Sequence, residues 1–191
     1  MSTRSDSAVR ARVQRLVCAA LFLALGMLLP FLTGQIPRFG AMLCPMHIPV
    51  LLCGFVCGAP WGAAVGAVLP LLRSVTLGSP PMLPIAAAMT VELAVYGAAA
   101  GLLYRVLPQK IPYIYASLAG AMLLGRAAWG AASAAIYALM GNAFSWKLFA
   151  AGAFVNALPG IVLQLVLIPL LVIALRAARL IPIGGGRAVR P

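Results

Sequence analysis

The residues best suited to do chemistry are two charges set in apolar sequence, Glu92 and Arg126. A charge inside a membrane segment is costly and usually faces a cavity or a partner. Polar and aromatic residues accompany these charges at helical spacing. They are Tyr96 after Glu92, then Trp129, Gly130, Ser133 and Tyr137 after Arg126, and a third stripe of Asn156, Gly160 and Gln164. If three helices turn these stripes toward one another, they form a polar pocket for a small molecule.

The charges also indicate which ligand groups such a pocket would accept. Arg126, together with Arg38 from a turn-rich stretch, would suit a carboxylate or phosphate through charge-assisted hydrogen bonds. Glu92 would suit an amine or a ring N–H, and the aromatic side chains would suit a flat ring. The alternative is a structural Glu92–Arg126 ion pair that only holds two helices together. The two interpretations are compatible, because a ligand pocket can contain an ion pair.

Two other features allow a functional and a plain interpretation. The stretch from Thr33 to Gly40, which includes Arg38, is rich in turn formers and could form a lid over a pocket, or simply be a solvated loop. His47, beside Pro45 and Pro49, could cap a helix or anchor it at the membrane interface. A single histidine makes no case for catalysis.

The cysteines and the motif content argue against an enzyme. Cys18, Cys44, Cys53 and Cys57 lie in or beside apolar segments and are best explained as small buried residues, because only His47 is available as a further metal ligand. The sequence has no Gly-rich phosphate loop with its lysine, no HExxH and no nucleophile elbow. We therefore predict no catalytic residue, no metal and no cofactor, and exclude an ATP-driven pump on this chain alone.

Composition decides the class of protein. The chain has 191 residues, of which 64% are hydrophobic and 8% are charged, with a formal net charge of +12. Soluble domains carry about 25% charged residues, so a soluble globular enzyme and a disordered chain are both excluded. A basic chain can indicate nucleic-acid binding, but with this apolar content a membrane protein with basic edges is the better interpretation.

The charge gaps predict an all-α, six-helix transmembrane bundle in a single domain. No Asp, Glu, Lys or Arg lies between Arg15 and Arg38 or between Arg38 and Arg73, and a span needs about 20 apolar residues. The predicted spans run over Leu16–Phe31, Pro45–Cys57, Trp61–Leu77, Leu83–Leu107, Pro112–Met140 and Leu148–Leu175, the second and third being short. The bundle covers residues 13–178, between basic tails at 1–12 and 179–191. Pro159 and Pro169 are expected to bend the sixth span.

Basic residues predict the orientation. Ten of them fall on the side that holds both tails: Arg4, Arg10, Arg12, Arg15, Arg105, Lys110, Arg176, Arg179, Arg187 and Arg190. The opposite loops hold Arg38 and Lys147, with Arg73 near the end of the third span. The positive-inside rule therefore predicts that both termini are cytoplasmic.

Small residues recur every four positions in three places. Gly54, Gly58, Gly62 and Gly66 cross the turn between spans two and three, Gly97 and Gly101 follow in span four, and Ala20 and Ala24 lie in span one. Such spacing lets helix backbones approach closely in lipid. For the glycines we expect internal packing. The alanine pair follows a basic tail and could instead face a partner.

Several stretches resemble the S components, the substrate-binding membrane subunits, of energy-coupling factor (ECF) vitamin transporters. They are Met46–Leu52, Gly58–Gly62, Pro70–Ser74, Met89–Gly97, Gly101–Tyr104 and Asn156–Ile161, continued by Leu163–Leu165 and Ile168–Pro169. The resemblance covers residues 13–178, and span number, length and basic tails agree with it. These motifs mark the family better than any subfamily.

The resemblance implies a mechanism. S components bind a vitamin or related micronutrient from outside and dock on a transmembrane scaffold protein with two ATPases, so this chain would be a subunit of an importer in a bacterial or archaeal plasma membrane. Their first helix contacts the scaffold through an AxxxA motif, which Ala20–Ala24 matches. Their ligand is held by helices four to six and the loop after helix one, where the three polar stripes and Arg38 lie.

The substrate and two rival functions stay open at this stage. Pantothenate, a folate, or a pyrimidine or pyridine vitamin could each use some of these side chains. The rivals are a solitary membrane transporter and a structural or assembly membrane protein in which Glu92 and Arg126 only pack helices together.

Overall fold

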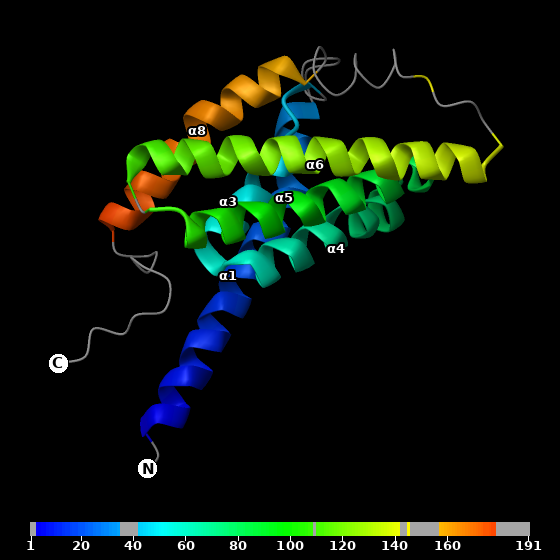
Figure 1. Ribbon diagram of the computed structural model, residues 1–191. Coiled ribbons are helices and arrows are strands. Elements are labelled where there is room, and N and C mark those ends of the chain that lie inside the picture. Colours follow the sequence, from blue (N-terminus) through cyan, green and yellow to red (C-terminus); the bar gives the residue numbers. More distant parts are fainter. Residues whose placement is uncertain (1–2, 35–41, 109, 142–144, 146–156, 179–191) are drawn as a thin grey trace.

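The structure of the protein, a computed structural model, describes residues 3–34, 42–108, 110–141, 145 and 157–178. Every element in these ranges is helical, which confirms the predicted all-α class. In chain order the elements are α1 (Thr3–Gly34), α3 (His47–Cys57), α4 (Ala59–Leu77), the short π-helical turn η1 (Met82–Ala86), α5 (Ala87–Val106), α6 (Ile111–Leu139) and α8 (Leu158–Ala177) (Figure 1).

Five stretches of helix are long and apolar enough to cross a membrane: Asp6–Leu32, Ala59–Leu77, Met82–Val106, Ile111–Leu139 and Leu158–Ala177. The remaining helix, α3, has only 11 residues. At about 1.5 Å per residue, it reaches roughly half of the ~30 Å hydrocarbon core. The fold is therefore that of a multi-pass membrane protein, in which the predicted second span is a helix too short to cross alone.

The first helix begins earlier than the sequence predicts. A basic tail is expected up to residue 12, but α1 starts at Thr3. Arginine and alanine favour helix, and Asp6 in the first turn complements the positive end of the helix dipole. Residues 6–17 are all exposed, and this part of α1 projects from the bundle (Figure 1).

The last helix also departs from prediction, at its start. The sixth span is expected from Leu148, but residues 146–156 lie outside the described part of the chain, and α8 begins at Leu158. Pro159 therefore occupies the first turn of α8, where its missing N–H removes no intrahelical hydrogen bond. The expected bend at Pro159 is wrong for this reason, whereas Pro169 does lie inside the helix.

The core is built around α5, which packs against α3, α4 and α6. Most of the glycines make this packing close, as predicted, whereas a Cβ atom added to Gly58 would meet nothing within 4 Å. A Cβ atom added to Gly97 would meet the backbone of Gly62 on α4, and one added to Gly54 would lie 2.5 Å from the carbonyl oxygen of Gly97. Gly66 similarly faces the backbone of Leu93. Because lipid provides little hydrophobic drive between helices, such backbone contact is a main source of their association.

A buried arginine joins α1 to α4. Arg73 is 9% exposed and donates from Nη1 to the carbonyl oxygen of Met27, at 2.9 Å. Its guanidinium carbon also lies 5.1 Å from the centre of the Phe31 ring, in cation–π geometry. These contacts fix the last turns of α1 on the bundle, far from its projecting start.

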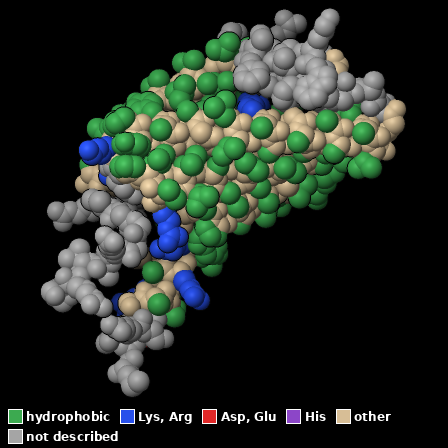
Figure 2. Space-filling model, viewed as in Figure 1, with side chains coloured by type: hydrophobic (Ala, Val, Ile, Leu, Met, Phe, Trp, Pro, Cys, Tyr) green, Lys and Arg blue, Asp and Glu red, His purple; other side chains and the backbone are tan. Residues whose placement is uncertain are grey.

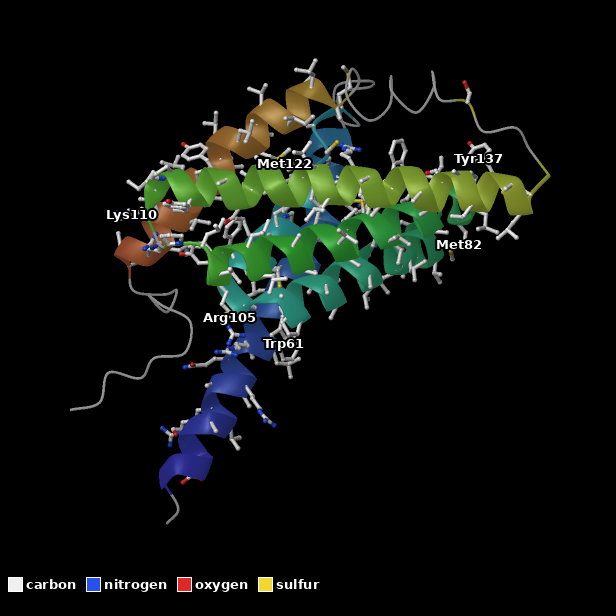
Figure 3. The ribbon with its side chains drawn as sticks, viewed as in Figure 1. Trp61, Met82, Arg105, Lys110, Met122 and Tyr137 are labelled. Atoms are coloured by element: carbon white, nitrogen blue, oxygen red, sulfur yellow. The ribbon has the colours of Figure 1, made fainter. Side chains whose placement is uncertain are left out.

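The surface and the helix ends agree with a membrane setting. Apolar side chains cover most of the face seen in Figure 2, and basic side chains gather toward the end of the bundle from which the N-terminal part of α1 projects. Figure 3 places Arg105 and Lys110 at that same end, with Met82 and Tyr137 at the other.

Adding one methyl group at the α4–α5 crossing should be costly. We expect Gly97→Ala to lower stability by about 1–3 kcal/mol, because overpacking must separate two backbones. Thermal unfolding in mild detergent would measure this as a drop of roughly 2–4 °C per kcal/mol for a chain of this size. The control is Gly120→Ala, whose new Cβ would meet only the end of the Leu103 side chain, at 2.9 Å. Equal melting temperatures for the two variants would contradict the assigned packing.

Candidate functional site

The centre of the site is the carboxylate of Glu92 on α5. The side chain is 2% exposed, and its Oε1 lies 3.0 Å from Nη1 of Arg126 on α6. The ion pair considered in the sequence analysis is therefore present. It joins two helices that pack against each other along their length.

A second nitrogen-bearing side chain, His47, approaches the same oxygen atom. Nε2 of His47 lies 3.5 Å from Oε1 of Glu92, and the histidine side chain is 5% exposed. The imidazole also stands edge-on to the ring of Tyr96, at 5.3 Å between centroids and 80° between planes. His47 is the first residue of α3, so this short helix begins at the site. Sequence reasoning treated His47 as a helix cap or interface anchor and missed this position.

The far side of the Arg126 guanidinium is occupied as well. Its Nη2 donates to the sulfur atom of Cys44 at 3.9 Å, and its central carbon lies 5.8 Å from the ring centre of Trp129. Cys44 belongs to the segment between α1 and α3. Burial raises the pKa of the Cys44 thiol, while the nearby positive charge of Arg126 acts in the opposite direction.

The cluster of Cys44, His47, Glu92 and Arg126 has unused hydrogen-bonding capacity. Both ring nitrogens of His47, Oε1 of Glu92 and Nε of Arg126 are buried without a hydrogen bond in the described part of the chain, although the ion-pair distances hold. A buried polar atom without a partner costs about 1–3 kcal/mol, so native proteins rarely leave several together. Chemically, the cluster offers donors and one acceptor to a polar ligand.

The other predicted site residues take varied positions. Ser133 on α6 and Gln164 on α8 are buried at 6% and 2% exposure. Tyr137 is half-buried near the end of α6 (Figure 3). Arg38 and Asn156 lie outside the described residues. The structure thus brings Glu92 and Arg126 together with two predicted aromatic residues, Tyr96 and Trp129, while the remaining predicted ligand contacts stay predictions.

The alanine pair of the first helix lies on the outside. Ala20 and Ala24 are exposed on α1, whereas Ala19 is 4% exposed and Gly26 faces the side chain of Leu69. The pair is therefore not used for packing within the described part of the bundle. A partner helix could approach α1 closely on this face.

No metal site is found among the described residues, where no group of three His, Cys, Asp or Glu could hold an ion. Cys53 and Cys57 are buried and Cys18 is half-buried, as expected for small apolar residues. The fold and the site together define a multi-pass membrane protein with a polar centre enclosed by helices, the arrangement expected of a protein that handles a small ligand.

Comparison with known families makes this specific. The chain matches the family described as "ECF transporter, substrate-specific component" over residues 14–172. This match covers most of the chain, so the protein belongs to that family and is the substrate-binding component of an ECF importer. Neither a curated protein nor a solved structure matches the chain significantly. Membership also indicates a multi-pass protein of a prokaryotic plasma membrane, with a role in substrate binding.

The coupling of Glu92 to Arg126 can be measured by a double-mutant cycle. We expect Glu92→Gln and Arg126→Met each to destabilise the protein by about 3–5 kcal/mol, because each leaves a buried partner uncompensated. The double variant should cost less than their sum, with a coupling of roughly 1–3 kcal/mol. Unfolding of the purified protein in detergent would supply the three free energies.

The control for the cycle is Arg105→Met, which removes an exposed arginine at the end of α5. Its effect should stay within about 0.5 kcal/mol. Strictly additive costs at Glu92 and Arg126 would mean that the two charges do not stabilise each other.

Proposed function

We propose that the protein captures a vitamin or related micronutrient from outside the cell and delivers it by docking on a transmembrane scaffold with two ATPases. Family membership supports the role of substrate-binding component. ATP hydrolysis is assigned to the partner subunits, in keeping with a sequence that has no phosphate-binding loop.

The buried cluster around Glu92 is the observation that carries the proposal. A purely structural ion pair would be expected to satisfy its own hydrogen bonds, whereas Arg126 Nε and the His47 ring nitrogens have none within the described residues. We assign Arg126 to an acidic group of the ligand and Glu92 to an amine or ring N–H. We assign Tyr96 and Trp129, which lie beside His47 and Arg126, to packing against a flat ring.

The remaining predicted contacts complete the proposed site. Ser133, Tyr137 and Gln164 extend it along α6 and α8, and Arg38 and Asn156 are proposed to join it from the chain between the described ranges. We do not name one vitamin, because carboxylate-bearing and ring-bearing candidates share these contacts. Pantothenate, a folate and pyrimidine or pyridine vitamins form the panel to be tested.

We further propose that both termini are cytoplasmic. The basic end of the bundle, with Arg105 and Lys110, is the end from which α1 projects (Figure 3), and basic residues favour the cytoplasmic side. A C-terminal fusion to a reporter that is active only in the cytoplasm should therefore be active. Activity of a periplasmic reporter at the same position would reverse the assigned orientation.

Ligand binding can be tested without knowing the ligand. Gentle purification followed by mass spectrometry should reveal a bound small molecule, and a member of the vitamin panel should raise the melting temperature. An empty protein that responds to no vitamin would overturn the proposed function.

Arg126→Lys separates ligand binding from ion pairing in this assay, because lysine keeps the charge facing Glu92 but loses the planar fork. We expect affinity to fall by about 10- to 100-fold, equivalent to roughly 1.4–2.8 kcal/mol. The matched control, Arg105→Lys, should bind normally, since Arg105 is exposed at the opposite end of α5 from the site. Unchanged affinity in Arg126→Lys would leave Arg126 with a structural role alone.

Docking can be tested on the exposed face of α1. Replacing both Ala20 and Ala24 with Trp should abolish uptake and co-purification with the ATPases, because bulky side chains prevent close helix approach. Vitamin binding by the isolated subunit should survive. A matched control exists on α6, where Ala127 and Ala131 are also exposed and four residues apart.

Tryptophan at both of these α6 positions should leave uptake intact. Uptake that continues in the α1 variant, or in cells without the partner subunits, would favour a solitary transporter. Loss of uptake in both double variants would point to a general effect of bulky surface residues.

A further inference from the structure

Residues 42–46, which lead into α3, lie between α8 and the site. A Cβ atom added to Gly160, in the first turn of α8, would lie 2.7 Å from the carbonyl oxygen of Met42 and 2.9 Å from that of Leu43. At the next residue, Cys44, the carbonyl oxygen accepts a 3.0 Å hydrogen bond from the backbone N–H of His47. Met42 and Leu43 are therefore packed against α8, and the chain leads from them through Cys44 to His47 of the cluster.

Cys44 is held in an unfavourable backbone conformation. Its φ is +48°, and among the described residues it is the only one other than glycine with positive φ. In this left-handed region a side chain with a Cβ is disfavoured. Such conformations persist where surrounding contacts enforce them. At Cys44 the conformation directs the sulfur atom toward Arg126.

The contact that this conformation secures is a weak one. Sulfur is a poor hydrogen-bond acceptor, and Cys44 Sγ lies 3.9 Å from Nη2 of Arg126. Glu92 engages the other terminal nitrogen, Nη1. Among the described residues, Nε of Arg126 and Nδ1 of His47 find no hydrogen-bond partner although both atoms are buried, and the His47 side chain is 5% exposed. The site thus presents the N–H donors of Arg126 and His47. One of them, Nη2 of Arg126, is covered by a weak acceptor, the sulfur atom of Cys44.

We propose that Cys44 is a displaceable cap on Arg126, whose place is taken by an oxyanion, a carboxylate or a phosphate, of the transported ligand. An oxyanion forms stronger, charge-assisted hydrogen bonds with a guanidinium than a thiol does. Because Glu92 is bound to Nη1, it need not leave when the ligand occupies Nη2. The inference rests on the proposed function and specifies the ligand group that this site recognises.

The cap makes binding selective for acids. A neutral analogue, such as an amide or alcohol, gains too little at Nη2 to displace Cys44. The acid both replaces the weak contact and lets Cys44 leave its left-handed conformation. Once displaced, the thiol moves from a half-buried to a more solvated position and becomes more reactive toward alkylating reagents.

Thiol labelling tests the proposal in the full-length protein. With Cys18, Cys53 and Cys57 changed to Ala, only Cys44 can react with N-ethylmaleimide. We expect an acid that binds to raise the labelling rate about tenfold or more, while its neutral partner does not. Suitable matched pairs are nicotinate with nicotinamide and pantothenate with pantothenol. Formate against chloride at equal ionic strength gives a comparison that requires no vitamin, and inorganic phosphate replaces formate in a further arm to distinguish the two oxyanions.

Variants at Cys44 supply a second readout by equilibrium dialysis. Cys44→Gly removes both the cap and the backbone strain and should tighten acid binding about threefold to tenfold. Cys44→Asp places a permanent carboxylate beside Arg126 and should weaken acid binding at least tenfold. The conservative substitution Cys44→Ser should give an affinity for the acid between those of the other two variants. Binding by this variant also confirms that the fold is kept.

The outcomes separate this inference from the proposed function. If an acid binds in dialysis but leaves Cys44 labelling unchanged or slower, the cap is wrong and the transport function stands. Tight binding of only neutral ligands would also overturn the cap. If no vitamin binds at all, the proposed function fails, and the formate and phosphate arms still decide whether an oxyanion displaces Cys44.

Discussion

The structure depends most on one buried negative charge. Glu92 is 2% exposed in a chain that has only two acidic residues, so its carboxylate must be neutralised within the bundle. Arg126 approaches from α6 at 3.0 Å and His47 from α3 at 3.5 Å. Removing either partner would leave an uncompensated charge away from water. The free-energy cost of that single charge is far larger than the cost of burying the paired charges. The helices α3, α5 and α6 are therefore held together at this carboxylate.

The glycine contacts explain how the helices can reach that point. Gly62 on α4 and Gly97 on α5 let their backbones touch, and Gly54 brings α3 into the same crossing. With α3 so close, its first residue, His47, is positioned over Glu92. Packing and electrostatics thus reinforce each other: small residues allow close approach, and the shared charge fixes which helix ends meet.

Patterns along the chain predicted much of this architecture. The apolar stretches and glycine spacing predicted the helices and their internal packing, because both depend on local periodicity. The Glu92–Arg126 pair was foreseen as an alternative, since a chain with so few acids leaves little choice of partner. Even so, the start of α1 and the position of Pro159 within α8 differed from expectation, because helix ends depend on capping and neighbours.

The roles of His47 and Cys44 could not be predicted in the same way. Cys44 and Arg126 are 82 positions apart, and their contact requires a left-handed backbone at a residue that is not glycine. No local pattern encodes that conformation. One signal was available for His47: apart from the cysteines, it is the only titratable side chain between Arg38 and Arg73. A polar group isolated in so long an apolar stretch should be suspected of serving a buried charge elsewhere.

The backbone contacts among α3, α4 and α5 also divide the molecule mechanically. Where backbones touch at glycine, no side chain can rotate to absorb a shift, so these three helices behave as a stiff plate. On the α6 side of α5 a glycine faces a side chain instead, because a Cβ atom added to Gly125 would lie 2.8 Å from the ring of Tyr96. A small shift between α5 and α6 can therefore be taken up by a ring, which is not available where α4 meets α5. The Glu92–Arg126 ion pair thus spans the more adaptable of these two interfaces of α5.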